Sequence, residues 1–348
     1  MLVYVAKRLL LMIPTLIGIL LVSFVIIQFV PGGPVEQLVR ELRGGLGGGE
    51  VAATGGYRGA QGVDPQQIEE IRRMYGFDRP APERFATMLR NYAVFDLGTS
   101  YLHHKSVWAL IVEKMPVSVS LGLWSFLLVY AVSIPLGIAK AVRHGSRFDL
   151  WTSVAILVGY AIPGFVLGVL LLVLFGGGSF WQIFPLRGLI SDDFDQLTLA
   201  GKVLDYFWHL AMPLACLVVG SFAVTTMLTK NTFLEEIRKQ YVLTARAKGL
   251  SERRVFYKHV FRNALIPLVT AFPAAFIGAF FTGSLLIETL FSLDGLGLLS
   301  YEAVIRRDYP VVLGTLYVFS LLGLVAKLLT DLAYTWVDPR VKFTAGAR

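Results

Sequence analysis

Charged residues and cysteines are scarce in this sequence. Of its 348 residues only 16% are charged, while 55% are hydrophobic, and the mean hydropathy is +0.64. This composition excludes an ordinary soluble domain and indicates several membrane-spanning helices. The single cysteine, Cys216, lies in an apolar run, which excludes a disulfide framework and a metal site built from several thiolates.

The residue patterns of an enzyme or a metal site are also missing. No Gly-x-x-x-x-Gly-Lys sequence occurs, and the glycines at 44–49 are not followed by the Lys-Ser/Thr of a phosphate-binding loop. His103, His104 and His209 do not have the spacing of metal ligands. We therefore expect no catalytic residue, no metal site and no cofactor bound by this chain. The pI near 9.5 does not predict nucleic-acid binding, because the excess positive charge lies in loops between apolar segments.

Six apolar segments have about the length of a membrane span. They cover residues 9–30, 118–139, 150–175, 210–228, 264–287 and 311–332. As a helix, the first segment would be about 33 Å long, enough to cross a bilayer core. The Pro-Gly-Gly-Pro sequence after it is not a signal-peptide cleavage site, so we expect an uncleaved first helix.

The charges of the loops alternate in sign along the chain. The net charge is +2 over residues 140–149, −2 over 176–207, +6 over 230–262, −2 over 288–309 and +2 over 335–348. This alternation predicts six spans with both termini in the cytoplasm. Residues 31–117 contain ten basic and ten acidic residues and would lie outside, because loops this long translocate regardless of their charge.

These patterns divide the chain into four parts. Residues 1–30 form the N-terminal tail and first span, 31–117 an extracytoplasmic region, 118–332 a five-helix membrane core, and 333–348 a cytoplasmic tail. Within the extracytoplasmic region, a glycine-rich loop at 44–62 precedes helices that we predict over residues 65–75 and 82–91.

The most basic part of the core is residues 231–263. We predict a helix from about Asn231 to Lys248 that ends at Gly249 in a left-handed conformation, followed by a second helix capped by Ser251. Val242, Ala245 and Gly249 lie at i, i+3 and i+7, so one face is smooth and the remainder is basic. A helix of this kind can lie on anionic lipid or dock into another protein.

Several separated motifs resemble the permeases of ABC importers in the dipeptide, oligopeptide and nickel branch. Residues 241–249 (YVLTARAKG) and 262–267 (RNALIP) are similar to the loop that couples those permeases to their ATPases. Residues 96–101 (DLGTSY) and 288–297 (ETLFSLDGLG) carry further similarity, and the glycine-rich insert is most like the microcin C type of oligopeptide permease.

The Glu-Ala-Ala of the family's coupling loop is replaced here by Leu-Thr-Ala, so another residue, such as Arg246, would make the charge contact with the ATPase. The resemblance assigns ATPase coupling to Tyr241, Val242, Thr244, Ala245, Arg246, Ala247, Lys248, Gly249, Leu250, Arg262, Asn263 and Pro267.

The resemblance implies an all-α integral membrane protein with six transmembrane helices in the type I ABC importer permease fold. A helical extracytoplasmic insertion would follow the first helix. The expected function is a permease subunit that moves oligopeptides, including microcin C-like peptides, across the bacterial inner membrane. The implied partners are a second homologous permease subunit, two ATPase domains (separate or fused) that bind ATP and Mg, and an extracytoplasmic substrate-binding protein. The chain itself would not be an enzyme.

Two further sets of residues are candidates for contact with substrate. Neutral polar residues in the spans suit a peptide backbone, although each hydroxyl alone can bond to its own helix. This predicted substrate path comprises Tyr160, Pro163, Ser221, Thr225, Thr226, Thr282 and Ser284. The loop before the last span resembles an extracytoplasmic gate, with Glu288, Phe291, Gly295, Gly297, Arg307, Asp308 and Tyr309. In the last span, Lys327 and Asp331 are spaced as a snorkelling i, i+4 pair.

Three alternatives stay open from the sequence. The first is a permease of the same branch for another solute, such as nickel or glutathione, although metal import would favour histidines or carboxylates in the spans. The second is a secondary transporter or channel without an ATPase, which would require intramembrane ionisable residues for ion coupling. The third is a membrane anchor with no transport role, which would not purify with ATPase subunits.

Overall fold

The computed structural model describes residues 2–29, 78–177, 180–281 and 285–337. Within these ranges the regular structure is helical, with one isolated β-bridge between Thr99 and Ser106. The chain forms two compact units. Unit 1 comprises Met1–Arg8, Lys114–Leu299 and Leu322–Arg348, and unit 2 comprises Leu9–Glu113 and Ser300–Leu321.

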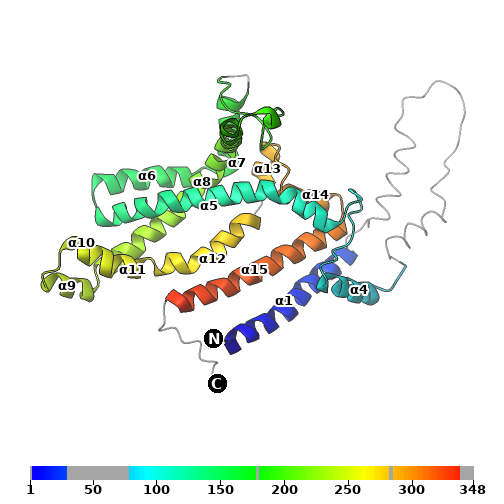
Figure 1. The fold of residues 1–348 in the computed structure, drawn as a ribbon, viewed down its shortest axis with the longest axis horizontal. Helices are drawn as coiled ribbons and strands as arrows, with labels where there is room; N and C mark the ends of the chain where they lie inside the picture. Colours follow the sequence, from blue (N-terminus) through cyan, green and yellow to red (C-terminus); the bar gives the residue numbers. More distant parts are fainter. Residues whose placement is uncertain (1, 30–77, 178–179, 282–284, 338–348) are drawn as a thin grey trace, which may run out of the picture. The chain divides into compact units, whose positions relative to one another are not determined.

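Four helices are long and apolar enough to cross a membrane (Figure 1). They are α1 (Leu2–Phe29), α5 (Val107–Val142), α8 (Leu199–Ile237) and α15 (Tyr309–Val337). Two bent pairs raise the number of candidate spans to six if each pair is one span. The protein is therefore an all-helical membrane protein with four to six candidate spans.

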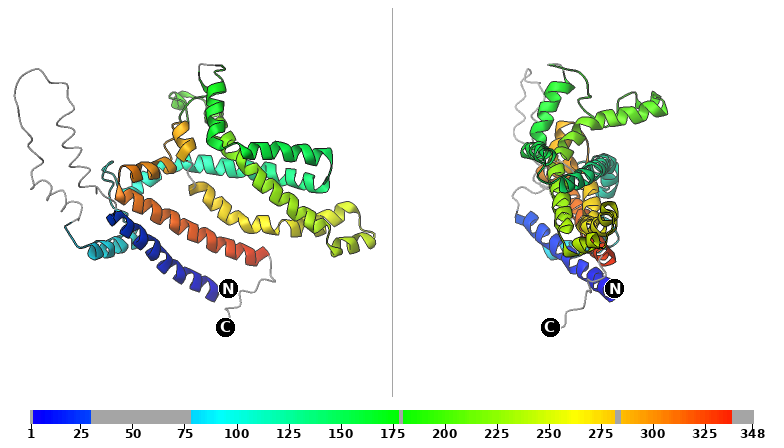
Figure 2. Two further views of the ribbon diagram at one scale, coloured as in Figure 1. Left: turned by 180° about the vertical axis from the view of Figure 1, so that it is seen from behind. Right: turned by 90° about the vertical axis from the view of Figure 1, so that its left-hand side faces the viewer.

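The first bent pair differs from the continuous span predicted over residues 150–175. α6 (Arg147–Ala161) and α7 (Gly164–Leu171), which continues as a π-helix (η1, Leu172–Gly176), meet at 89° (Figure 2). Pro163 causes the break, because it lacks an N–H and forces Ile162 into an extended conformation with ψ 116°. α6 and α7 both pack against α8.

The long helices extend well beyond the apolar segments from which we predicted them. α5 begins at Val107 instead of near Ser118, and α8 begins at Leu199 instead of near Leu210. The Thr198 side chain caps α8 by accepting a 3.2 Å hydrogen bond from the Gly201 N–H. Hydropathy detects only the apolar part of a membrane helix, so it does not predict the polar ends by which the helix extends beyond that part.

The second bent pair lies beyond the basic stretch. Its first half is a short helix, α10 (Glu252–Val255), a π-helix, η3 (Phe256–Val260), and α11 (Phe261–Ala264). It meets α12 (Ile266–Phe281) at 44°. Elsewhere in unit 1, one apolar core cluster contains Leu121, Leu210, Met212, Leu214, Cys216, Ile287, Phe291 and Leu293.

The helix predicted over residues 231–248 is in fact two helices. α8 ends at Ile237, and a separate helix, α9 (Gln240–Ala247), follows. The Lys239 backbone is extended, with ψ 148°, and this single residue breaks the pattern without a proline or glycine to mark it. Ser251 stands at the N-cap of α10 as predicted, but its side chain makes no capping hydrogen bond.

Unit 2 contains α4 (Ala81–Ala93), which confirms the helix predicted over residues 82–91. Its aromatic residues pack on the spans of the same unit, with Phe85 against Phe24 at 5.3 Å and Tyr92 against Tyr317 at 5.1 Å between ring centroids. The predicted glycine-rich loop at 44–62 and the helix at 65–75 lie outside the described residues.

Two short helices, α13 (Leu285–Leu290) and α14 (Leu296–Ile305), lie between α12 and α15. At the other end of α15, the predicted Lys327–Asp331 pair does not form. The Asp331 carboxylate instead lies 2.7 Å from Arg8 Nη2 and accepts a 2.9 Å hydrogen bond from the Tyr4 hydroxyl. Asp331 therefore pairs with Arg8 of α1 and not with Lys327 of its own helix.

Candidate functional site: coupling loop, membrane cavity and outer loops

The basic loop is built around the smooth face of α9. Val242 is fully buried and Ala245 is 6% exposed. They belong to one apolar cluster with Ala141, Phe233, Val255, Val260 and Ala264. The smooth face therefore packs against the chain's own core.

Tyr241 joins the two halves of the predicted coupling motif. Its hydroxyl accepts a 3.1 Å hydrogen bond from Asn263 Nδ2 and lies 3.3 Å from the His259 carbonyl oxygen. The same hydroxyl donates to the Glu236 carboxylate. Burial raises the pKa of Tyr241 and the bond to Glu236 raises it further, so the phenol stays protonated at neutral pH. Sequence reasoning missed Glu236, because nothing in its spacing distinguishes it from a solvated acid.

The outward face of the loop carries different residues. Leu243, Thr244, Ala247 and Lys248 are exposed, and Leu243 is an apolar side chain with 49% of its surface accessible. Arg246 is also exposed, but it forms a two-pronged ion pair with Glu252, with Nε–Oε1 and Nη2–Oε2 distances of 2.8 and 3.0 Å. Of the remaining predicted coupling residues, Leu250 is half-buried, whereas Gly249, Arg262, Asn263 and Pro267 are exposed.

Gly249 adopts the predicted left-handed conformation, with φ +75°. A Cβ atom added there would meet no atom of the described residues within 4 Å, so a side chain would project outward. Beyond the glycine lies a hollow of about 430 Å³. It is lined by Ser251, Arg253, Arg254, Tyr257 and Lys258. The accessible features of the loop are therefore the apolar side chain of Leu243, the turn at Gly249 and the basic hollow.

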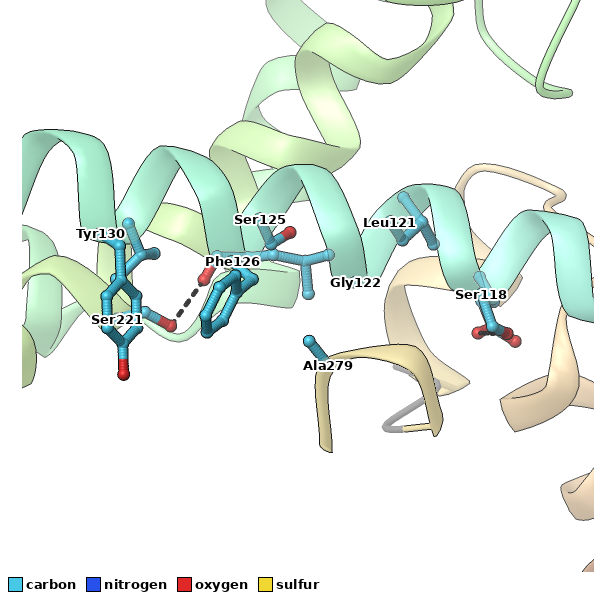
Figure 3. Close-up of a pocket in the computed structure, with 11 residues that line it drawn as sticks. Ser118, Leu121, Gly122, Ser125, Phe126, Tyr130, Ser221 and Ala279 are labelled. Atoms are coloured by element: carbon cyan, nitrogen blue, oxygen red, sulfur yellow. Dashed lines mark hydrogen bonds between the residues drawn. The ribbon is translucent and has the colours of Figure 1, made fainter. Parts of the chain in front are cut away.

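A second hollow, a cavity of about 230 Å³, lies between the helices of unit 1 (Figure 3). Its wall includes the hydroxyl-bearing residues Ser118, Ser125, Tyr130 and Ser221, together with the Glu288 carboxyl group. The Ser125 hydroxyl is buried and has no hydrogen-bond partner among the described residues. The cavity wall is therefore mostly apolar with a few hydroxyl groups, of which Ser221 already donates to the Leu217 carbonyl oxygen at 3.0 Å.

Among the described residues of the predicted substrate path, Ser221 lines this cavity. Tyr160 is 56% exposed on α6, and Pro163 forms the break before α7. Thr226 is fully buried, and its hydroxyl has no hydrogen-bond partner among the described residues. The Thr225 carbonyl oxygen accepts a 2.8 Å hydrogen bond from the Thr229 hydroxyl. Thr282 and Ser284 lie outside the described residues. Sequence reasoning missed Ser118 and Ser125, which lie in the polar start of an apolar span.

The cavity wall contains a very close approach between two helices at Gly122. A Cβ atom placed on Gly122 would lie 1.5 Å from the Ala279 carbonyl oxygen of α12 (Figure 3). Backbone therefore meets backbone at this point, and only glycine permits it.

Glu288 stabilises the loop between α13 and α14 in unit 1. Its fully buried carboxylate accepts the Leu298 N–H at 2.8 Å and the Ser118 hydroxyl at 3.4 Å. The Ser118 hydroxyl oxygen also accepts the Leu296 N–H at 2.8 Å. A Cβ on Gly295 would lie 2.6 Å from the Glu288 carboxyl carbon, so a residue with a side chain would clash with Glu288 at this position. Burial is the main cause that raises the pKa of Glu288.

Asp308 has the corresponding role in unit 2. Its buried carboxylate accepts the Ser100 hydroxyl at 2.5 Å and the N–H groups of Tyr101 and Leu102 at 3.1 and 3.4 Å. Two motifs that are far apart in the sequence, 96–101 and 307–310, are joined in this way. The predicted gate residues fall into two groups: Glu288, Phe291, Gly295 and Gly297 are in unit 1, whereas Arg307, Asp308 and Tyr309 are in unit 2.

We expect Asp308→Ala to destabilise the protein by about 2–3 kcal/mol, because it leaves the buried Ser100 hydroxyl and the Tyr101 N–H without their charged acceptor. Thermal unfolding of the purified protein in detergent measures the loss. Asp192→Ala is the matched control, since Asp192 is exposed. Equal midpoints for both variants would contradict a clamping role for Asp308.

The comparison with known proteins identifies the family. Residues 133–343 match the family described as "binding-protein-dependent transport system inner membrane component". The chain belongs to this family. It is thus a multi-pass component of a transport system in the bacterial inner membrane, and it is not itself a catalytic subunit.

Named relatives align with almost the entire chain. The sequence is 56% identical to the peptidoglycan transport system permease protein YejB of Agrobacterium fabrum and 52% identical to the inner membrane ABC transporter permease protein YejB of Escherichia coli O157:H7. Each alignment covers 98% of this chain and 98% of the relative. The dipeptide transport system permease protein DppB of Escherichia coli K12 is 32% identical, over 98% of this chain and 99% of its own. The resemblance to ABC importer permeases of the peptide branch is confirmed.

Proposed function

We propose that this family member is a permease subunit of an ATP-driven importer that moves oligopeptides across the inner membrane. The observation that carries the proposal is the coupling loop, in which Tyr241 and Asn263 join the two halves of the motif while Gly249 and its neighbours are exposed. The peptide substrate is supported by the relatives, which are named for peptidoglycan and dipeptide transport. The Ser125 hydroxyl in the cavity wall is a neutral group that could bond a peptide amide, and it lies in the same wall as the Glu288 carboxyl group.

The proposal includes three kinds of partner: a second homologous permease subunit, two ATPase domains that bind ATP and Mg, and an extracytoplasmic binding protein. Leu243 and the basic hollow lined by Arg253 and Arg254 support docking of an ATPase with an acidic, apolar-rimmed groove. ATP binding would close the ATPase pair and draw the coupling loops together. The two permease subunits would then rock between inward and outward access, driven by contacts that differ in energy between the two states.

Peptides derived from peptidoglycan are a second candidate for the substrate, because the relative at 56% identity is named for peptidoglycan transport. Reconstitution of the complete complex in vesicles distinguishes the candidates. We expect ATP-dependent uptake of a labelled tripeptide, and competition by a muropeptide would show that both use one pathway. Uptake of nickel or glutathione without uptake of either peptide would overturn the proposed substrate class.

We further propose six spans with both termini in the cytoplasm and residues 31–117 outside. Single cysteines introduced at Gly55 and Gly346 test this topology, and the buried Cys216 thiol contributes little background. An impermeant maleimide should label Gly55→Cys in intact spheroplasts but Gly346→Cys only after permeabilisation. If both cysteines react from the same side, the topology is wrong.

A further inference from the structure

Three charged side chains from three helices meet on the side of unit 1 that carries the coupling loop. Asp149, in the first turn of α6, is 5% exposed. Lys230 Nζ, from α8, lies 2.7 and 2.8 Å from its two carboxylate oxygens. Lys140 Nζ, from α5, lies 3.1 Å from Oδ1. We call Lys140, Asp149 and Lys230 the ion lock.

Further hydrogen bonds surround the lock. The fully buried Lys140 ammonium donates to the Asp149 carbonyl at 2.8 Å, to Thr152 Oγ1 at 2.8 Å and to Ser153 Oγ at 2.7 Å. On the other side, Asp149 Oδ2 accepts the Gly145 N–H at 3.2 Å and lies 3.4 Å from His144 Nδ1. The α5–α6 turn is thereby bonded to α8 in one defined register.

Stability alone does not explain this arrangement. Burial of three charges has a large desolvation cost, and apolar residues of similar volume commonly hold helices together equally well. Directional bonds from two ammonium groups to one carboxylate instead fix the helices in one relative position, whereas an apolar contact can slide. The ion lock would therefore transmit the displacement of one of these helices to the other two.

The lock lies between the coupling loop and the cavity. Ala141, next to Lys140, packs in the same apolar cluster as Val242 and Ala245 of α9. Lys230 lies two turns before the end of α8, which leads into α9. In the other direction, α5 continues to Gly122 and Ser118 in the cavity wall.

We propose that Lys140, Asp149 and Lys230 are positioning residues that join α5, α6 and α8 into one body, so that displacement of the coupling loop moves the cavity wall. This inference rests on the proposed docking of ATPases at the coupling loop. The lock contacts neither ATP nor peptide, and its removal separates ATP hydrolysis from transport.

Single substitutions have unequal consequences because the lock holds two cations and one anion. Asp149→Asn leaves the buried Lys140 ammonium and the partly buried Lys230 ammonium without their counter-ion and reduces the amount of folded protein. Lys230→Met leaves the Lys140–Asp149 pair in place and is milder. The triple variant Lys140→Met/Asp149→Leu/Lys230→Met removes every charge of the lock and retains apolar packing, so it tests the lock without a buried unpaired charge.

The experiment uses the complete complex, with ATPase subunits and binding protein, in vesicles that contain ATP. ATP hydrolysis and tripeptide uptake are measured together for the wild type, the triple variant and Arg147→Met, an exposed control in the same turn. We expect the triple variant to assemble with its ATPases in wild-type amount but to hydrolyse at least tenfold more ATP per peptide imported. The control should keep the wild-type ratio.

Two outcomes overturn the ion lock. A triple variant with the wild-type ratio of hydrolysis to uptake would show that the lock is only packing. A triple variant that loses its ATPases would show that the lock shapes the docking surface and does not transmit movement. Failure of the proposed function is distinct, because the wild-type chain itself would then not purify with ATPase subunits or would import no peptide.

Discussion

Gly249→Val is expected to reduce peptide uptake more than tenfold while the permease is still made and inserted in normal amount. A β-branched residue is poorly suited to the φ of +75° at this position. Its side chain would also project outward, because no atom of the chain lies within 4 Å of an added Cβ. Both effects act on the proposed docking face and leave the membrane helices unaffected. Uptake, ATPase rate and co-purification of the ATPase in reconstituted vesicles measure the result.

Two further variants separate the causes. Gly249→Asn tolerates the left-handed backbone but keeps an added side chain, so it isolates the effect of bulk. Arg246→Ala breaks only an exposed ion pair with Glu252, and pairs of this kind contribute at most about 1 kcal/mol, so we expect a mild effect. Wild-type transport and normal ATPase coupling by Gly249→Val would show that this loop is not the docking element.

Gly122→Val is expected to have the second largest effect, because α12 must move away from α5 to admit any side chain. The Cβ would lie 1.5 Å from the Ala279 carbonyl oxygen, and a helix backbone cannot yield as a flexible side chain does. We expect about 3 kcal/mol of destabilisation and more than a tenfold loss of uptake. Thermal unfolding in detergent and uptake in vesicles measure the two quantities.

The matched control for this change is Gly220→Ala on α8, where an added Cβ would meet no atom of the chain within 4 Å. It should be neutral or slightly stabilising, because alanine favours the helix more than glycine does. If Gly122→Val unfolds at the wild-type temperature and transports normally, the close approach of α5 and α12 is not a feature of the working protein.

The sequence predicted those features that depend on local chemistry. Long apolar runs located the candidate spans, and the left-handed turn at Gly249 followed from a glycine at the end of a helical pattern. The local rules failed where neighbours decide the outcome. No breaking residue marks the interruption at Lys239, so α8 and α9 were predicted as one helix. Residues 150–175 were predicted as one continuous span, whereas the chain turns by 89° within them and α7 packs on α8.

Contacts between distant segments were beyond local reasoning. The loop before the last span suggested a gate that includes Asp308, but the hydrogen bond between Ser100 and Asp308 spans 208 positions, and no local spacing encodes it. Spacing also misassigned Asp331, because an i, i+4 lysine is a weak partner compared with an arginine held beside it by packing. Val242 and Ala245 had the spacing of a helix face, but spacing does not tell whether that face meets a partner or the chain's own core.

The length of α8 has a mechanical consequence. Its 39 residues make a rod of about 58 Å, roughly twice the thickness of a bilayer's hydrocarbon core. A tilt of about 10° around the midpoint of this rod would sweep each end through about 5 Å. One end of the rod leads into α9 and the proposed coupling loop, so a change in the tilt of α8 would displace that loop. Bilayers of different thickness are expected to hold a helix of this length at different tilts.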